Sequence, residues 1–363
     1  MHKFAGAGPG TRVTRIARAL AAVTLTGLFA ATAHAQSSVT LYGSLDGGLR
    51  NVVNGTKAGG AVLSMASNGV YQSNRLGFLG IEDLGAGYYV RFDLEAGYVL
   101  STGANSSTTN QLFQRNSTVG FGGPFGQVDM GHQFTLQHRI IKDFEPFNLR
   151  YLGVTEAAAI SGGTSGRDDS AIHYHGDFGP WTVRAAYAPG GVAGSLADGT
   201  MLAGGVNYHT RTFKFGAGYT RRSKALSATT DEYFGSDQYT AGGAVSIGPV
   251  DLMGGYSLNL QAVPSSALSL TRNQYLWGGF RYAISSYFSM TGAYYDNKNK
   301  TNGVDGRKGV AILGVNYVLS KRTQLYADVD YTHFTGGYVA NATLNPSLHS
   351  KQTGISFGID HRF

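Results

Sequence analysis

Hydrophobic and polar residues alternate along the chain from residue 39 to its last residue, with few signs of helical periodicity. The alternation is clearest in the segments 39–50, 89–98, 323–331 and 354–363. Such a segment forms a β-strand with one apolar and one polar face, because successive side chains point to opposite sides. The pattern therefore predicts a large antiparallel β protein.

Two kinds of connection separate the predicted strands. Tight turns with mostly Gly, Pro, Ser or Asp chemistry are expected at 83–85, 123–126, 178–180, 210–211, 248–249, 284–285 and 320–321. Longer polar stretches lie at 51–73, 99–113, 134–167, 190–199, 223–236, 260–271, 297–307 and 335–350. The two kinds alternate strictly, so the sequence predicts sixteen strands, with both ends of the barrel chain on the short-turn side.

Residues 1–35 are predicted to form a secretory signal peptide, which leaves 36–363 as a single barrel domain. Four basic residues precede a short apolar run at 19–33, and Ala33-His34-Ala35 is a small-x-small cleavage site. A transmembrane anchor is the alternative, but this run is short for crossing about 30 Å of hydrocarbon.

A soluble barrel or sandwich would bury the apolar strand faces, whereas a transmembrane barrel turns them toward lipid and its polar faces toward a lumen. The signal peptide, the unequal connections and the strand lengths favour the membrane barrel. Sixteen strands also leave room for an aqueous channel, whereas eight are filled by side chains.

Composition narrows the class of protein further. The chain has 53 Gly, 22 Tyr and 19 Phe but no Cys, so no disulfide framework stabilises it. The formal charge of +7 falls to +3 without the four basic residues of the signal, leaving 25 Lys and Arg against 22 Asp and Glu. These basic residues are spread thinly, which argues against a nucleic-acid partner.

Several segments resemble the general, trimeric porins of Gram-negative bacteria, most closely the β-proteobacterial type. They are SSVTLYGSLDGGL, SNRLGFLGIEDLGAGYYVRFDLEAGY, QRNSTVGFGGPFGQVDMGHQ, GRDDSAIHYH and the terminal HRF. The resemblance implies a sixteen-stranded outer-membrane barrel with short periplasmic turns, a homotrimer and a third loop folded into the lumen. It also implies that Phe363 is the assembly signal read by the barrel-insertion machinery. Asn116 and Thr118 are expected to face outward, toward a neighbouring protomer.

The longest connection, 134–167, matches that third loop. It is rich in Phe, Ile, Leu and Tyr, which favours packing inside the barrel over free solvation. It carries Asp143 and Glu145, and similar porins present acidic side chains from this loop across from arginines on the wall. The resemblance places Arg75, Arg115 and Arg167 in that arginine ladder.

Alternation also points Arg50, Arg91 and Arg184 inward, as a possible extension of the basic track. The predicted function is passive diffusion of small polar solutes and inorganic ions, with modest anion preference at a constriction of arginines and loop carboxylates. A substrate-specific channel and an adhesive barrel remain alternatives.

The sequence predicts no enzyme, because it contains no HExxH motif and no GxSxG nucleophile elbow. Residues 354–358 match the letters GxSxG, but they lie within a predicted strand and not at the strand-to-helix turn that such an elbow needs. His173 and His175 face one way, but two ligands fall short of a metal site, and no cofactor is expected. The other expected partners are outer-membrane lipid and lipopolysaccharide.

Overall fold

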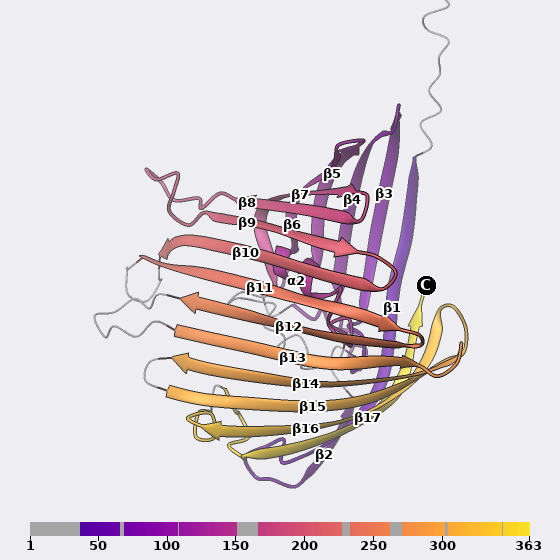
Figure 1. The fold of residues 1–363 in the computed structure, drawn as a ribbon, viewed down its shortest axis with the longest axis vertical. Helices are drawn as coiled ribbons and strands as arrows, with labels where there is room; N and C mark the ends of the chain where they lie inside the picture. Colours follow the sequence, from indigo (N-terminus) through magenta and orange to yellow (C-terminus); the bar gives the residue numbers. More distant parts are fainter. Residues whose placement is uncertain are drawn as a thin grey trace, which may run out of the picture.

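The computed structural model describes residues 37–65, 69–107, 109–150, 166–226, 233–261, 271–301, 304–342 and 344–363. The predicted signal peptide at 1–35 lies outside them. The described residues form one antiparallel sheet that closes on itself around a short helix, α2 (Leu136–Ile141) (Figure 1). No helix in this part of the chain is long and apolar enough to cross a membrane.

Sixteen strands make the wall, and a short seventeenth strand, β2 (Ala61–Met65), lies in the first long connection. The wall strands are β1 (Ser38–Val53), β3 (Arg75–Gly85), β4 (Tyr88–Gly97), β5 (Asn116–Gly123), β6 (Gly126–Phe134), β7 (Arg167–Phe178), β8 (Trp181–Ala188), β9 (Met201–His209), β10 (Phe213–Leu226), β11 (Tyr233–Ile247), β12 (Val250–Gln261), β13 (Thr271–Ala283), β14 (Phe288–Thr301), β15 (Val304–Val318), β16 (Thr323–Gly336) and β17 (Lys351–Arg362). The predicted strand number and closed barrel are confirmed.

The barrel closes where the last strand meets the first. Strand β17 pairs with β1 from Ser44↔Arg362 to Val53↔Thr353. On its other side β1 pairs first with β3 and, beyond Ser44, with β2. Over the length in which β1 and β17 pair, the hydrogen bonds close the sheet, so neither of these terminal strands has an unpaired edge there.

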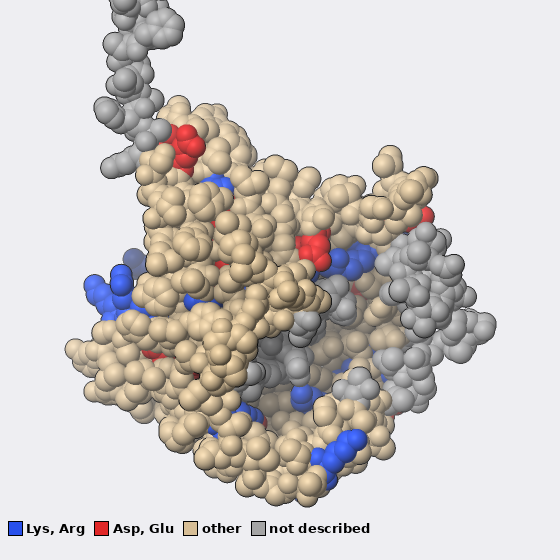
Figure 2. Space-filling view, turned by 180° about the vertical axis from the view of Figure 1, so that it is seen from behind, with Lys and Arg blue, Asp and Glu red and all other residues tan. Residues whose placement is uncertain are grey.

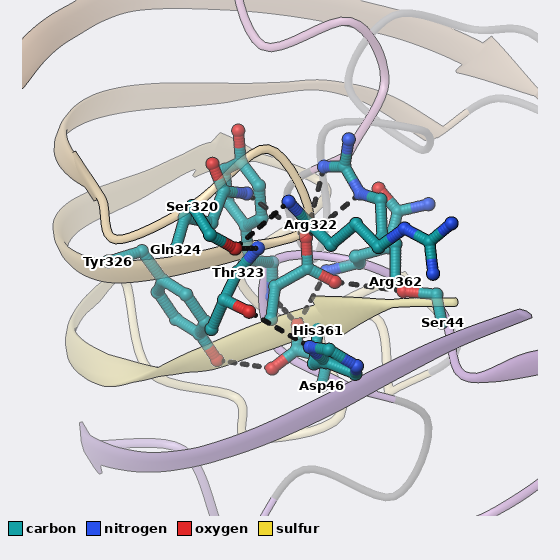
Figure 3. A network of polar contacts seen from close by, with 12 residues as sticks. Ser44, Asp46, Ser320, Arg322, Thr323, Gln324, Tyr326, His361 and Arg362 are labelled. Carbon is teal, nitrogen blue, oxygen red and sulfur yellow. Dashed lines mark hydrogen bonds and ion pairs between the residues drawn. The ribbon is translucent and has the colours of Figure 1, made fainter. Parts of the chain in front are cut away.

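Polar side chains reinforce this seam on its inner face (Figure 3). Tyr326 donates to Asp46 Oδ1 at 2.6 Å, and Ser44 donates to Asp360 Oδ1 at 2.8 Å. The second oxygen of Asp360 accepts from Gln324 at 3.1 Å. Since Asp46 and Asp360 are each 1 % exposed, these bonds satisfy carboxylates that water barely reaches.

Six of the seven predicted tight turns fall between consecutive strands. The seventh, predicted at 83–85, lies at the end of β3, and the chain turns just beyond it at residues 86–87. Two long connections are shorter than predicted, because β10 and β11 extend to Leu226 and from Tyr233, and β14 and β15 extend to Thr301 and from Val304. The ends of these strands are rich in polar residues, so the alternation of hydrophobic and polar positions is weak there in the sequence. Cross-strand pairing forms them instead.

The barrel is apolar outside and polar inside. Ile355 and Phe357 are 54 % and 55 % exposed on the outer face of β17, whereas the inward Ser356 is 1 % exposed. The expected outward direction of Asn116 and Thr118 is wrong: Asn116 donates to the inward Asp93 at 2.8 Å, and Thr118 is buried. Register across β4 and β5, not the weak local pattern, decides their direction.

Candidate functional site: the barrel interior

The described part of the third long connection, 135–150, lies against the inner wall. Thr135 caps α2 by accepting a hydrogen bond from the backbone N–H of His138 at 3.2 Å. The helix then lays Leu136 and Ile140 on the wall glycines of β9 and β10. A Cβ atom at Gly205 would stand 2.4 Å from Ile140 Cδ1, so only glycine permits this close approach.

Beyond α2, hydrogen bonds hold the segment across the lumen to more distant strands. Trp277 Nε1 on β13 donates to the Phe144 carbonyl at 3.3 Å, and Arg281 on the same strand donates to the Pro146 carbonyl at 2.6 Å. Phe144 itself is fully buried. The expectation that this connection packs inside the barrel therefore matches the structure over its described residues.

Glu145 anchors the segment from within the packed interior. Its side chain is fully buried, accepts from Tyr295 on β14, and accepts from the Leu149 N–H at 2.6 Å. Burial raises the pKa of this carboxyl, and the donated hydrogen bonds oppose that shift. The structure thus gives Glu145 a packing position, not one facing the open lumen.

Asp143 keeps contact with solvent, its side chain being 28 % exposed. Its Oδ2 atom lies 3.0 Å from His209 Nε2 and accepts from Asn207 Nδ2, also at 3.0 Å. Both partners belong to β9. Among the described contacts, neither loop carboxylate touches the three arginines of the predicted ladder.

Those three arginines gather on the other wall around one acidic residue, Glu95 of β4. Arg115 Nε lies 2.7 Å from Glu95 Oε1, and Arg75 Nε lies 3.5 Å from Glu95 Oε2. Arg167 joins them by donating to the Arg115 carbonyl at 2.5 Å. The cluster therefore carries three positive charges against one negative charge.

An aromatic stack supports Arg167. Its guanidinium lies 4.1 Å from the centre of the Phe134 ring, and His138 stacks on the same ring at 3.8 Å. Burial, together with the neighbouring charges of Arg167 and Lys142, holds the pKa of His138 well below its usual value. His138 is therefore neutral in the folded protein at neutral pH.

The other predicted arginines separate into two groups. Arg50 is neutralised by Asp330 on β16, with Nη1 2.7 Å from Oδ2 and Nη2 3.1 Å from Oδ1. Arg184 lines a small cavity beside Arg139 of α2. Burial lowers the pKa of Arg139, and the charge of Arg184 lowers it further, whereas Asp129 opposes the shift. Arg91 Nη2 lies 3.7 Å from Asp93 Oδ2.

Sequence reasoning missed Glu95, Phe134, His138 and Arg139. Glu95 carried a usable signal, because alternation places it on the same strand face as Arg91 and Asp93. The other three lie at the end of β6 or on α2, where no period-two pattern applies. Figure 2 shows a hollow in the molecule with Lys and Arg side chains on its walls.

Comparison with known proteins decides the class of the barrel. A family model described as Gram-negative porin matches residues 19–337. The chain belongs to the Gram-negative porin family. Two outer membrane porins resemble it over nearly their whole lengths. The porin from Bordetella pertussis is 28 % identical, and the match covers 95 % of this chain and 99 % of the relative. The porin from Delftia acidovorans is 27 % identical, and the match covers 91 % of this chain and 95 % of the relative.

Solved structures share the fold of this porin. An anion-selective porin from Comamonas acidovorans superposes with a TM-score of 0.73 at 22 % identity, covering 90 % of this chain and all of that one. OmpT of Vibrio cholerae, in a trimer form, superposes with a TM-score of 0.67 at 14 % identity, covering 90 % of this chain and 99 % of that one. The porin therefore resides in the outer membrane, with short turns toward the periplasm and long loops outside. Family and fold point to a channel rather than an enzyme.

Proposed function

We propose that this porin lets small hydrophilic solutes and inorganic ions diffuse passively through the outer membrane, with a modest preference for anions. The observation that carries the proposal is the cluster of Arg75, Arg115 and Arg167, whose single close acidic partner within the described part of the chain is Glu95. A net positive charge on a narrow, low-dielectric wall attracts anions and repels cations.

The charges act without a chemical step. A polar solute entering the lumen aligns its dipole with the field of the arginines, whereas an apolar solute must displace water from charged groups. Asp143, the partly exposed loop carboxylate, supplies the negative side of that field. Glu145 serves this function by fixing the loop, not by facing the solute.

Reversal potentials across planar bilayers in a salt gradient test the selectivity. Arg75→Ala with Arg115→Ala should shift the permeability ratio toward cations, while Arg211→Ala with Arg322→Ala, on exposed periplasmic turns, should leave it unchanged. A wild-type channel with pronounced cation preference would contradict the proposal. Saturable block of the current by one solute would point to a substrate-specific channel instead.

The same proposal includes a homotrimer and assembly through the barrel-insertion machinery at Phe363. The trimer form of the structurally similar OmpT supports the first. The second is supported by the position of Phe363, which exchanges backbone hydrogen bonds with Gly43 of β1 and is 38 % exposed at the end of the last strand. Migration of unboiled protein on a denaturing gel checks the oligomeric state.

A further inference from the structure

Four carboxamide side chains stand in one row on the inner wall of four adjacent strands, β11 to β14 (Figure 1). They are Gln238 on β11, Asn259 on β12, Asn273 on β13 and Asn299 on β14, and each is the direct register partner of the next. Their inward direction follows from the strand period, since Tyr239 is 46 % exposed on the outer face whereas its neighbour Gln238 is 7 % exposed. We call these four residues the amide row.

The wall around the amide row carries no charge. On the extracellular side of Trp277 and its register partner Tyr295, every described inward side chain of β11 to β14 is a hydroxyl or an amide. Charged side chains begin on the flanking strands: Arg222 on β10 pairs with Asp168, and Lys308 on β15 lies over the Phe334 ring at 5.9 Å. The lumen therefore has a neutral hydrogen-bonding wall, separate from the arginine cluster.

Several amide oxygens of this neutral wall lack a donor from the chain. Within the described residues, the Oδ1 atoms of Asn259, Asn273 and Asn297 accept no hydrogen bond. Asn259 is only 2 % exposed, so bulk water barely reaches it. Buried polar atoms without a partner are unfavourable, and native proteins satisfy nearly all of them. The wall is thus suited to receive donors from another molecule.

The two ends of a carboxamide decide which kind of solute fits. Its NH2 group donates hydrogen bonds and its oxygen accepts them. An anion only accepts, so it would leave the amide oxygens without donors, and an ammonium group only donates, so it would leave the NH2 groups without acceptors. A hydroxyl group does both. A neutral solute with several hydroxyl groups therefore matches the amide row better than an ion does.

An aromatic side chain lies beside the amide row. Tyr275 is partly exposed and stands two residues from Asn273 on the same face of β13. Its register partners are Ser257 and Asn297. A tyrosine ring presents a flat apolar face next to a polar hydroxyl group. A sugar ring has the matching surface, with C–H groups on its face and hydroxyl groups around its edge.

The amide row lies on the extracellular side of the third loop. Trp277, which donates to the Phe144 carbonyl of that loop, is four residues from Asn273 along β13. At about 3.3 Å per residue, Asn273 lies about 13 Å farther along the strand toward the outside. A solute that enters from outside therefore reaches the row before it reaches the loop.

We propose that the amide row, together with Tyr275, is a weak binding site for neutral sugars on their way through the channel. This inference rests on the proposed channel function and adds a solute class that the arginine cluster does not select. Asn273 and Asn299 are partly exposed and contact the sugar, and the broad last torsion of an Asn side chain lets Oδ1 turn toward it. Binding is weak because each hydrogen bond replaces one to water, and weak binding lets the sugar leave.

Titration of the single-channel current with maltotriose, raffinose and a polyethylene glycol of similar mass tests the inference. Both sugars should block the current saturably and with similar affinity. Polyethylene glycol, whose oxygens are almost all ethers that only accept, should lower the current in proportion to its concentration.

The variant Asn273→Ala, Asn299→Ala should raise the half-blocking concentration of both sugars at least about fivefold. A second variant, Asn273→Leu, keeps the side-chain volume without the hydrogen bonds and should weaken the block in the same direction. The matched control is Asn316→Ala, near the periplasmic end of β15, whose Oδ1 likewise accepts no hydrogen bond within the described residues. It should leave the block unchanged.

Three results would overturn the inference. One is an equal, non-saturating loss of current with the sugars and with polyethylene glycol. Another is an unchanged half-blocking concentration in both amide variants while heat-modifiable gel migration shows that they are folded. The third is block by only one of the two sugars, which would mark a substrate-specific channel. Reversal potentials of the same channels separate the two proposals, because anion preference without sugar block overturns the sugar site alone.

Discussion

At the scale of single residues, the partner of each charged side chain determines what that side chain can do. Arg50 is paired with Asp330 and donates to Ser356, so its charge is largely neutralised and acts only weakly on a passing ion. Arg75 and Arg115 share one carboxylate, Glu95, so part of their charge remains available. Arg50 on β1 therefore stabilises the wall, whereas Arg75 and Arg115, beside Glu95 of β4, are placed to influence ion selectivity.

Glu95→Gln should make the channel more anion-selective, because it removes the carboxylate that Arg75 and Arg115 share. At a partly hydrated site this is worth about 0.5–1 kcal/mol, which corresponds to a roughly two- to fivefold rise in the anion-to-cation permeability ratio. Reversal potentials in a KCl gradient measure it. Glu82→Gln, at an exposed position near the periplasmic end of β3, is the control. An unchanged ratio in Glu95→Gln would show that these arginines do not set selectivity.

His138 should make the folded barrel sensitive to acid. Its pKa is lowered in the folded state, so below the unfolded value of about 6.5 the unfolded chain takes up a proton that the folded chain refuses. Stability is then lost as the pH falls, by at most about 2 kcal/mol at pH 5. His138→Phe keeps the ring stacked on Phe134 without the titration. Thermal unfolding in detergent at pH 7.5 and 5 should show a smaller fall for this variant than for the wild type.

At the scale of elements, glycines on the inner wall position the third loop, because they leave space for its side chains. Gly205 and Gly218 each leave the space that Ile140 Cδ1 occupies, and Gly242 leaves the space that the Phe144 ring occupies. A helix as short as α2 is unstable alone, so packing on this smooth wall and its cap hold it in place. Loop position is therefore encoded as much in the strands as in the loop.

Gly205→Val should displace α2 from the wall, since its Cβ would meet Ile140 Cδ1 at 2.4 Å and Leu136 Cδ2 at 3.0 Å. Overpacking of this kind costs about 1–3 kcal/mol. We expect altered single-channel conductance and closure at lower voltage in bilayer recordings. Gly204→Val is the matched control, because a Cβ at the adjacent Gly204 meets nothing within 4 Å. Identical behaviour of the two variants would contradict the packing account.

At the scale of the whole molecule, the barrel depends on one long-range pairing, between β1 and β17. The terminal residue takes part: Gly43 N–H donates to the Phe363 carbonyl at 3.1 Å, and Phe363 N–H donates to the Gly43 carbonyl at 3.3 Å. The pattern of the last ten residues is thus that of a strand whose outer face meets lipid and whose end completes the wall.

Deletion of Phe363 should reduce the yield of folded barrel in the outer membrane by more than it changes the conductance of the barrels that do form. Its ring lies against Gly43, on the same outward face of β1 as Val39 and Leu41, so it does not line the path of a solute. Heat-modifiable gel migration of membrane fractions and single-channel recording of the purified protein measure the two effects. Full assembly without Phe363 would contradict its role as a signal.

The sequence by itself determined the strand number, the turns and the inside-out polarity, because period-two alternation and turn chemistry are local properties. It also pointed Arg75 and Arg167 toward the lumen by parity with their apolar neighbours. The resemblance of five segments to porins added the third loop and the arginine ladder. The family match confirms the resemblance, and the ladder stays a prediction.

Only the tertiary structure decided which charges lie together. Glu145 and Asp143 are two residues apart, yet one is fully buried against β14 and the other meets β9 with its carboxylate partly exposed. Glu95 and Arg115 are twenty residues apart and touch. Such partnerships depend on register and on how a loop crosses the lumen, and both result from long-range pairing that no local pattern records.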